Sequence, residues 1–135
     1  MLGGRKVLKL PVRRDQDLGE IVRSGIPSEA VRVLALRTHT SVGFVIEAAG
    51  LNRRTMERRL STKAKLKKEE SDGIVRVARI VAHATEALGE ERGLRWLHLP
   101  NRALGGKRPA ELLNTEADAR VVEDVLVRIE HGVFS

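Results

Sequence analysis

Several residue types are scarce in this chain of 135 residues, and each scarcity excludes a kind of protein. The chain has no cysteine, which excludes a disulfide framework, a thiolate nucleophile and a cysteine-ligated zinc site. Its aromatic residues are limited to Phe44, Trp96 and Phe134. No apolar run approaches the roughly 18 residues that span a bilayer, and the N-terminus lacks the apolar segment of a signal peptide. We therefore expect a cytoplasmic protein that makes no membrane contact.

The motifs of common catalytic sites are also missing. The segment Asn101–Thr115, NRALGGKRPAELLNT, contains Gly-Gly-Lys and invites comparison with a phosphate-binding P-loop. A P-loop would need Ser or Thr where Arg108 stands, Gly where Asn101 stands, and a preceding strand, which the pattern does not predict. The segment is better explained as a turn that positions helices, so it predicts no nucleotide site.

The titratable residues do not form a recognisable catalytic or metal site. His39, His83, His98 and His131 lie on separate segments without HExxH spacing, and we expect each at the surface or at a helix end. The adjacent carboxylates Glu69-Glu70, Glu90-Glu91 and Glu123-Asp124 would point to different helix faces, as solvated surface residues do. We therefore predict that the protein is not an enzyme and has no catalytic residue, cofactor or metal ion.

Positive charge is concentrated in the first half of the chain. Residues 1–68 carry 16 Lys and Arg against 6 Asp and Glu, a balance of +10, whereas residues 69–135 carry 9 against 12, a balance of −3. A basic surface attracts nucleic acid, because neutralising phosphates releases counterions. The alternative is that these basic helices are only solvated. The acidic half calls for a different partner.

Helical periodicity dominates the pattern, and alternating strand patterns are hard to find, so we predict an all-α fold. Residues 1–14 are predicted to be a flexible basic arm. Ser28, Asn52, Thr115 and either Ser41 or Thr40 are expected to cap helices, and Gly89 and Gly132 to end them. The last helix should bury one apolar face, made of Val121, Val122, Val125, Leu126 and Ile129. The predicted helices are 15–23, 29–38, 42–49, 53–60, 68–88, 90–98 and 116–131.

Residues 42–60, VGFVIEAAGLNRRTMERRL, have the pattern of a helix-turn-helix. Gly50 stands at the turn, and a small shared core is predicted from Val45, Ala49, Leu51, Met56 and Leu60. Val45 occupies a position where crossing helices usually have a smaller residue, which indicates a wider crossing. The second helix would project a basic face suited to base edges and phosphates. Its predicted DNA-binding residues are Arg53, Arg54, Glu57 and Arg58.

The second half carries a more specific pattern over residues 96–132. It contains Trp-Leu, then Pro-Asn-Arg-Ala-Leu-Gly-Gly, a Pro followed by Glu-Leu-Leu, and a final Glu-Asp-x-Leu-x-Arg-Ile-Glu-x-Gly. Residues 61–132 thereby resemble the Xre/MbcA/ParS toxin-binding domain. The upstream segments GLNRRTMERRL and EESDGIVRVARIVAHATEALG also resemble Xre-type antitoxins, so the resemblance covers residues 28–135.

This resemblance implies the antitoxin of a type II toxin–antitoxin pair. The cognate toxin would carry a RES domain that consumes NAD or ADP-ribosylates a target. Antitoxins of this kind dimerise, block the active site of the toxin, and often bind operator DNA to repress their own operon. The implied organisation is an arm over residues 1–14, an Xre-like helix-turn-helix region over 15–67, and a toxin-binding and dimerisation domain over 68–135.

Two groups of residues are candidates for toxin contact under this resemblance. Arg102, Lys107 and Arg108 would be exposed donors around the Gly-Gly turn, unless they are only solvated. The tail Val133, Phe134 and Ser135 would reach the NAD site of the toxin, with Phe134 as an apolar anchor and the terminal carboxylate near phosphate-holding groups. The alternative for the tail is that it frays or packs on the core.

Two other functions remain open at this point. The chain could be a stand-alone transcription regulator whose C-terminal half only dimerises or senses a ligand. It could also be an interaction module that no longer binds DNA. A neighbouring gene for a RES-type protein separates the first from an antitoxin, and operator binding separates the second.

Overall fold

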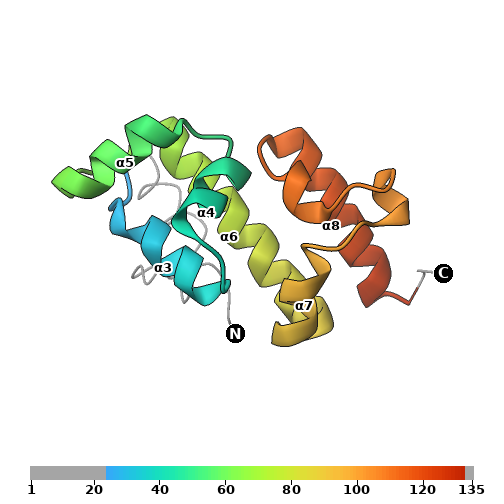
Figure 1. Ribbon diagram of the computed structural model, residues 1–135. Helices are drawn as coiled ribbons and strands as arrows, with labels where there is room; N and C mark the ends of the chain where they lie inside the picture. Colours follow the sequence, from blue (N-terminus) through green and yellow to red (C-terminus); the bar gives the residue numbers. More distant parts are fainter. Residues whose placement is uncertain (1–23, 133–135) are drawn as a thin grey trace.

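The computed structural model describes residues 24–132, and they form an α-helical fold (Figure 1). Within this range the only extended pairing is an isolated antiparallel bridge between Pro27 and Lys65. The all-α prediction is confirmed. The predicted arm 1–14, the predicted helix 15–23 and the tail 133–135 lie outside the described residues. The helices are α3 (Glu29–Arg37), α4 (Val42–Ala48), α5 (Arg53–Thr62), α6 (Lys68–Leu88), α7 (Glu90–Trp96), η1 (Arg102–Leu104), η2 (Pro109–Leu112) and α8 (Glu116–Glu130).

Local capping sets where most of these helices begin. Ser41 Oγ accepts from the amide of Phe44, Asn52 Oδ1 from Thr55, and Thr115 Oγ1 from Asp118, at 3.0, 2.8 and 3.1 Å. These three predicted caps are confirmed. The fourth is wrong: α3 starts after Ser28, but the Ser28 hydroxyl donates to the carbonyl of Arg59 at 3.3 Å instead of capping. The start of α3 is therefore fastened to α5.

The long helix α6 lies in the middle of the molecule (Figure 1), with α3 to α5 on one side and α8 on the other. Its apolar stripe is buried over Ile74, Val77, Ala78, Val81 and Ala84. Side chains from both halves of the chain join these residues in one continuous hydrophobic core. Because α6 packs against α3, α4, α7 and α8, it supports both candidate functional regions at once.

The predicted apolar face of α8 needs one correction. Val122, Val125 and Leu126 are buried and Ile129 is half-buried, but Val121 is 48% exposed. Successive residues on a helix are turned by about 100°, so Val121 lies outside the stripe that faces α6. Among residues 24–132, no helix is both long and apolar enough to cross a bilayer.

The turn between α4 and α5 is packed against the segment that precedes α8. Gly50 has φ +73°, and a Cβ on it would lie 2.9 Å from Asn114 Cβ. Gly73 of α6 comes equally close on another side, because a Cβ there would lie 2.8 Å from the carbonyl oxygen of Ala49. Glycine is therefore needed at both positions for the turn to sit where it does.

Candidate functional site

Helices α4 and α5 are joined by a small apolar core that fixes the crossing of the predicted helix-turn-helix. Val45, Ala49, Met56 and Leu60 are buried and Leu51 is half-buried, as predicted. Ile46, beside Val45, is buried as well. Because the apolar side of α5 is buried in this core, its opposite face is exposed to solvent.

The four predicted DNA-binding residues lie on that exposed face of α5. Arg53 Nε is 3.3 Å from Glu57 Oε2, one turn further along the helix. Arg54 and Arg58 make no ion pair or side-chain hydrogen bond with any part of the chain that the structure describes. The structure thus brings the four residues together on one accessible surface, and their contact with DNA remains a prediction.

The next arginine of α5, Arg59, has a structural role. Its Nε and terminal nitrogen donate to the two carboxylate oxygens of Glu70 at 2.7 and 3.1 Å, and both side chains are largely buried. Hydrogen bonding from Arg59 holds the pKa of Glu70 below its usual value. The prediction that Glu70 is a solvated carboxylate is therefore wrong, because this pair joins α5 to the start of α6.

The segment 101–107, which we call the Asn101 loop, is held together mainly by Asn101. The Asn101 amide donates to the carbonyl of Lys107, and its carbonyl accepts from the amides of Leu104 and Gly106, all within 3.0 Å. Its side-chain Oδ1 accepts from the amide of Ala103 at 2.9 Å. Gly105 and Gly106 have φ of +66° and +83°, so the predicted turn is confirmed.

The loop exposes two cations that are free of ion pairs in the described part of the chain, and Arg108, which follows it, is a third cation that is held in place. Arg102 and Lys107 are exposed and, within residues 24–132, have no side-chain partner. Arg108 differs from the prediction of a free donor: its Nε donates to Glu111 Oε2 at 3.0 Å, and its backbone amide donates to the same oxygen at 3.1 Å. This hydrogen bonding from Arg108 lowers the pKa of Glu111.

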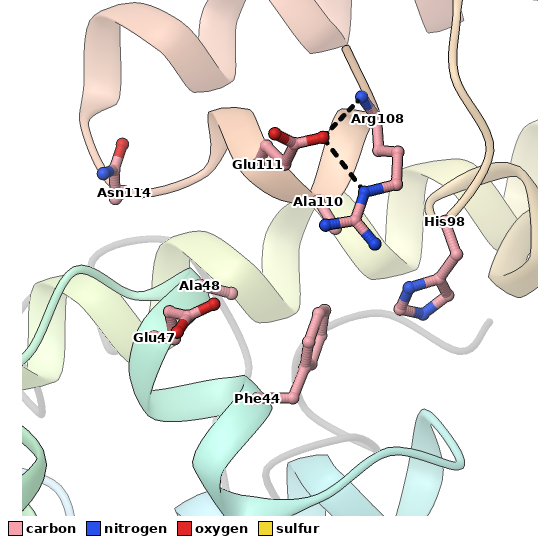
Figure 2. Close-up of a pocket in the computed structure, with 8 residues that line it drawn as sticks. All are labelled: Phe44, Glu47, Ala48, His98, Arg108, Ala110, Glu111 and Asn114. Atoms are coloured by element: carbon pink, nitrogen blue, oxygen red, sulfur yellow. Dashed lines mark hydrogen bonds and ion pairs between the residues drawn. The ribbon is translucent and has the colours of Figure 1, made fainter.

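A cavity of about 480 Å³ lies where α4 faces the segment 98–114 (Figure 2). Phe44 and Glu47 line it from α4, and His98, Arg108 and Asn114 line it from the other side. The Phe44 and His98 rings are tilted against each other, with centroids 5.0 Å apart. Burial, with a smaller effect of the Arg108 charge, lowers the pKa of His98. The predicted helix extends to His98, but α7 ends at Trp96, so His98 lies just after it. Its pairing with Phe44 could not be predicted from the sequence.

A charged cluster that the sequence did not reveal joins α6 to α8. His83 Nε2 is 2.9 Å from Glu130 and Nδ1 is 3.5 Å from Glu123, while Arg79 contacts Glu116 at 2.9 Å and Glu123 at 3.3 Å. Burial alone would lower the pKa of His83, but the two carboxylates outweigh it and raise the pKa. The expectation of a surface or helix-end His83 and a merely solvated Glu123 is wrong.

No three metal-ligating side chains converge anywhere in residues 24–132. Candidate binding features in that range include the basic face of α5, the Asn101 loop and the cavity between α4 and segment 98–114. They present cations and an aromatic side chain on accessible parts of the molecule.

Comparison with known proteins relates the chain to a family of antitoxins. Residues 83–132 match the family described as the antitoxin Xre/MbcA/ParS C-terminal toxin-binding domain. The chain is similar to a protein named Antitoxin Xre from Yersinia enterocolitica, with 30% identity over 128 residues, or 93% of this chain and 86% of the relative. It is equally similar to an Antitoxin Xre from Photorhabdus laumondii, with 30% identity over 132 residues, or 96% and 89% of the two chains. A third relative, from Sphingobium, is named Prs ADP-ribosylating antitoxin and is 25% identical over 125 residues, covering 85% of this chain and 79% of its own.

Proposed function

Because the chain belongs to the Xre antitoxin family, with a C-terminal toxin-binding domain, we propose that it neutralises a RES-domain toxin and represses its own operon. Membership makes it an antitoxin of a toxin–antitoxin system. The NAD-consuming or ADP-ribosylating activity of the toxin is the finer proposal. It is supported by the relative named Prs ADP-ribosylating antitoxin. The antitoxin itself would act by binding and not by catalysis.

The main support for toxin binding is the position of the Asn101 loop within the matched domain, residues 83–132. The loop is fixed by the hydrogen bonds of Asn101 and carries Arg102 and Lys107 without internal partners in the described chain. A fixed loop loses little entropy on binding, so its cations are well suited to an acidic surface on the toxin. Arg108 would contribute through its terminal nitrogens while Glu111 holds its Nε.

Co-expression with the product of the adjacent gene tests this proposal. The wild-type chain should co-purify with the toxin and prevent loss of cellular NAD. We expect the double change Arg102→Ala and Lys107→Ala to weaken the complex at least tenfold, because two charged contacts would be lost. Arg95→Ala, which removes one exposed cation from α7, is the control. Failure of the wild type to bind the toxin would remove the proposal.

The tail Val133, Phe134 and Ser135 lies outside the described residues, and its entry into the NAD site of the toxin stays a proposal. Deleting these three residues should abolish inhibition while leaving the complex intact, if the tail blocks the active site. An assay of NAD consumption with the purified complex separates these two effects. Unchanged inhibition would contradict the role of the tail.

Repression is proposed from the exposed face of α5, with Arg53, Arg54, Glu57 and Arg58 at the DNA. Gel shifts with the DNA upstream of the operon test it, comparing the wild type with Arg53, Arg54 and Arg58 changed together to Ala. We expect a shift only for the wild type, since three phosphate- or base-binding cations are removed. If the wild type gives no shift, the chain is not a repressor.

We propose that residues 15–67 form the DNA-binding region and residues 68–135 the toxin-binding and dimerisation domain. Helix-turn-helix proteins commonly bind paired half-sites as dimers, which is the reason to expect a homodimer. Light scattering of the purified chain should give twice the monomer mass of 15.0 kDa. A monomer at micromolar concentration would contradict this assembly.

The cavity beside α4 favours one alternative function, a regulator that senses a small ligand. Phe44 and Glu47 lie on the first helix of the helix-turn-helix, so a ligand against them would act directly on the DNA-binding region. This alternative predicts DNA binding without any toxin partner. Co-purification with the adjacent gene product would exclude it.

A further inference from the structure

The guanidinium group of Arg53 is seated on the first turn of α4. A Cβ placed on Gly43 would lie 2.9 to 3.3 Å from three guanidinium atoms of Arg53, so the group rests directly over the glycine backbone. Glu57 holds the same side chain from the other direction, with 3.3 Å between its Oε2 and Arg53 Nε. The side chain is nevertheless 71% exposed. Arg53 thus has a fixed direction, toward α4, and an accessible end.

Arg54 and Arg58 are placed differently, although they belong to the same helix. They lie four residues apart, and residues at this spacing share one helix face. Both are exposed, and neither is paired with another side chain in residues 24–132. Their guanidinium groups are therefore free to extend away from the body of the protein along α5.

In a helix-turn-helix, the first helix crosses the DNA backbone and the second lies in the major groove. In that arrangement a guanidinium fixed over α4 would lie beside the DNA backbone, whereas unpaired guanidinium groups on α5 would enter the groove. We infer that Arg53 contacts a DNA phosphate, oriented by Gly43 and Glu57, and that Arg54 and Arg58 contact base edges. This inference rests on the proposed DNA-binding function.

Glu57 and Gly43 then each have a defined role in orienting Arg53. Glu57 is a positioning residue that acts through Arg53, although a glutamate on this face could in principle accept a hydrogen bond from cytosine. Gly43 provides the space in which the guanidinium lies, since any side chain there would displace it. Neither residue then determines which base pairs are bound.

Selection of binding sites from random-sequence DNA with the full-length protein tests these assignments. R53Q should enrich the same sequence as the wild type but bind it several-fold more weakly. The slope of log affinity against log salt concentration should fall in magnitude by about 0.9, the value for one phosphate contact. R54Q or R58Q should instead lower discrimination at a particular base pair about tenfold. E57Q should keep the preferred sequence.

The variant G43A tests whether Gly43 positions the Arg53 guanidinium, and circular dichroism checks that the variant is folded. It should weaken binding without changing the preferred sequence, and in the R53Q background it should have no further effect. R95Q is the matched control, because Arg95 is also exposed and paired with a glutamate four residues away, on α7. It should bind DNA as the wild type does.

Two results would overturn the inference in different ways. If R53Q or E57Q enriches a different base, these residues determine sequence specificity. If G43A and R53Q weaken binding additively, Gly43 does not position the side chain of Arg53. Either leaves the DNA-binding proposal intact. If the wild type enriches no sequence and binds no DNA, the proposed repressor function fails and the inference fails with it.

Discussion

At the scale of single residues, the conformation of the Asn101 loop depends on one side-chain hydrogen bond and three backbone bonds of Asn101. Asn101→Ala should lower the free energy of unfolding by about 1 kcal/mol, the usual effect of losing such a cap. Asn101→Asp keeps an acceptor oxygen and should restore most of that loss. Urea denaturation of the three proteins measures the difference. Equal stability of the Ala variant would mean that the backbone bonds alone hold the loop.

The histidines give the molecule a pH dependence that can be assigned residue by residue. Glu130 and Glu123 raise the pKa of His83 above its ordinary value of 6.5. Protonated His83 is thus favoured in the folded state, so its stabilisation is complete below about pH 6.5 and is lost as the pH rises through the raised pKa. We expect His83→Gln to lower the melting temperature at pH 6 more than at pH 8.

His98 provides the control for this prediction, because its pKa is shifted in the opposite direction. Burial lowers the pKa of His98, so its neutral form is favoured in the folded state. The stability it contributes is present above pH 6.5 and falls as the pH drops below that value. His98→Gln should therefore reduce the loss of stability on acidification. If both variants change the pH dependence of stability in the same way, the opposite pKa shifts assigned to His83 and His98 are contradicted.

At the scale of helices, two glycines within helices should respond in opposite ways to the same substitution. In Gly73→Ala, the new Cβ would lie 2.8 Å from the carbonyl oxygen of Ala49, the residue that follows α4, and a backbone atom cannot move aside as the end of a side chain can. We expect a destabilisation of about 1–3 kcal/mol, as for other overpacked contacts. Gly43→Ala meets only the flexible end of Arg53, so alanine's higher helix propensity should keep or raise stability, by up to about 1 kcal/mol. Urea unfolding of both variants measures the contrast.

The same scale explains which parts of the fold follow from the sequence. The start of α4, α5 and α8 could be predicted because Ser41, Asn52 and Thr115 bond amides only three residues away. The length of α6 followed from its apolar period and from Gly89. Ser28 was mispredicted because its hydroxyl is used by a residue 31 positions away. Propensity contains no information about such a partner.

The candidate sites likewise combine features that follow from local sequence with features that depend on tertiary contacts. That α5 exposes its basic face follows from the spacing of Met56 and Leu60, which fixes the buried side. The ion pair between Arg108 and Glu111 is local, because the two residues are three positions apart in the sequence. Opposite charges at this spacing on a helix predict such a pair. The position of the Arg53 guanidinium over Gly43 depends on the angle at which α4 and α5 cross. That crossing angle is set by tertiary packing and not by either helix alone.

At the scale of the whole molecule, Arg76 of α6 joins the two candidate functional regions. Its Nε donates to the carbonyl of Leu113 at 2.7 Å, and its terminal nitrogen donates to the carbonyls of Asn114 and Ala49 at 3.0 and 3.3 Å. One guanidinium thus bonds the end of α4, in the predicted helix-turn-helix, and the segment before α8, in the matched toxin-binding domain. Arginine suits this position because its donors are spread over a rigid plane.

Replacement of Arg76 should therefore weaken the connection between the halves and not merely one helix. Arg76→Met keeps the apolar stem but leaves three carbonyls without this donor, so we expect a loss of about 2–3 kcal/mol in the free energy of unfolding. Arg76→Lys keeps the charge, but a single ammonium cannot reproduce the planar set of bonds, so it should recover only part of the loss.

The decisive measurement is whether the two halves still unfold together. Trp96 is the only tryptophan, so its fluorescence reports the second half, while circular dichroism reports all helices. The wild type, with one continuous core, should give coincident transitions by both probes. In Arg76→Met we expect the transitions to separate, because the bonds from α6 that bridge Ala49 and Asn114 are gone. Transitions that remain coincident and unshifted would mean that α6 packing, without Arg76, makes the proposed DNA-binding region and the matched toxin-binding domain one cooperative unit.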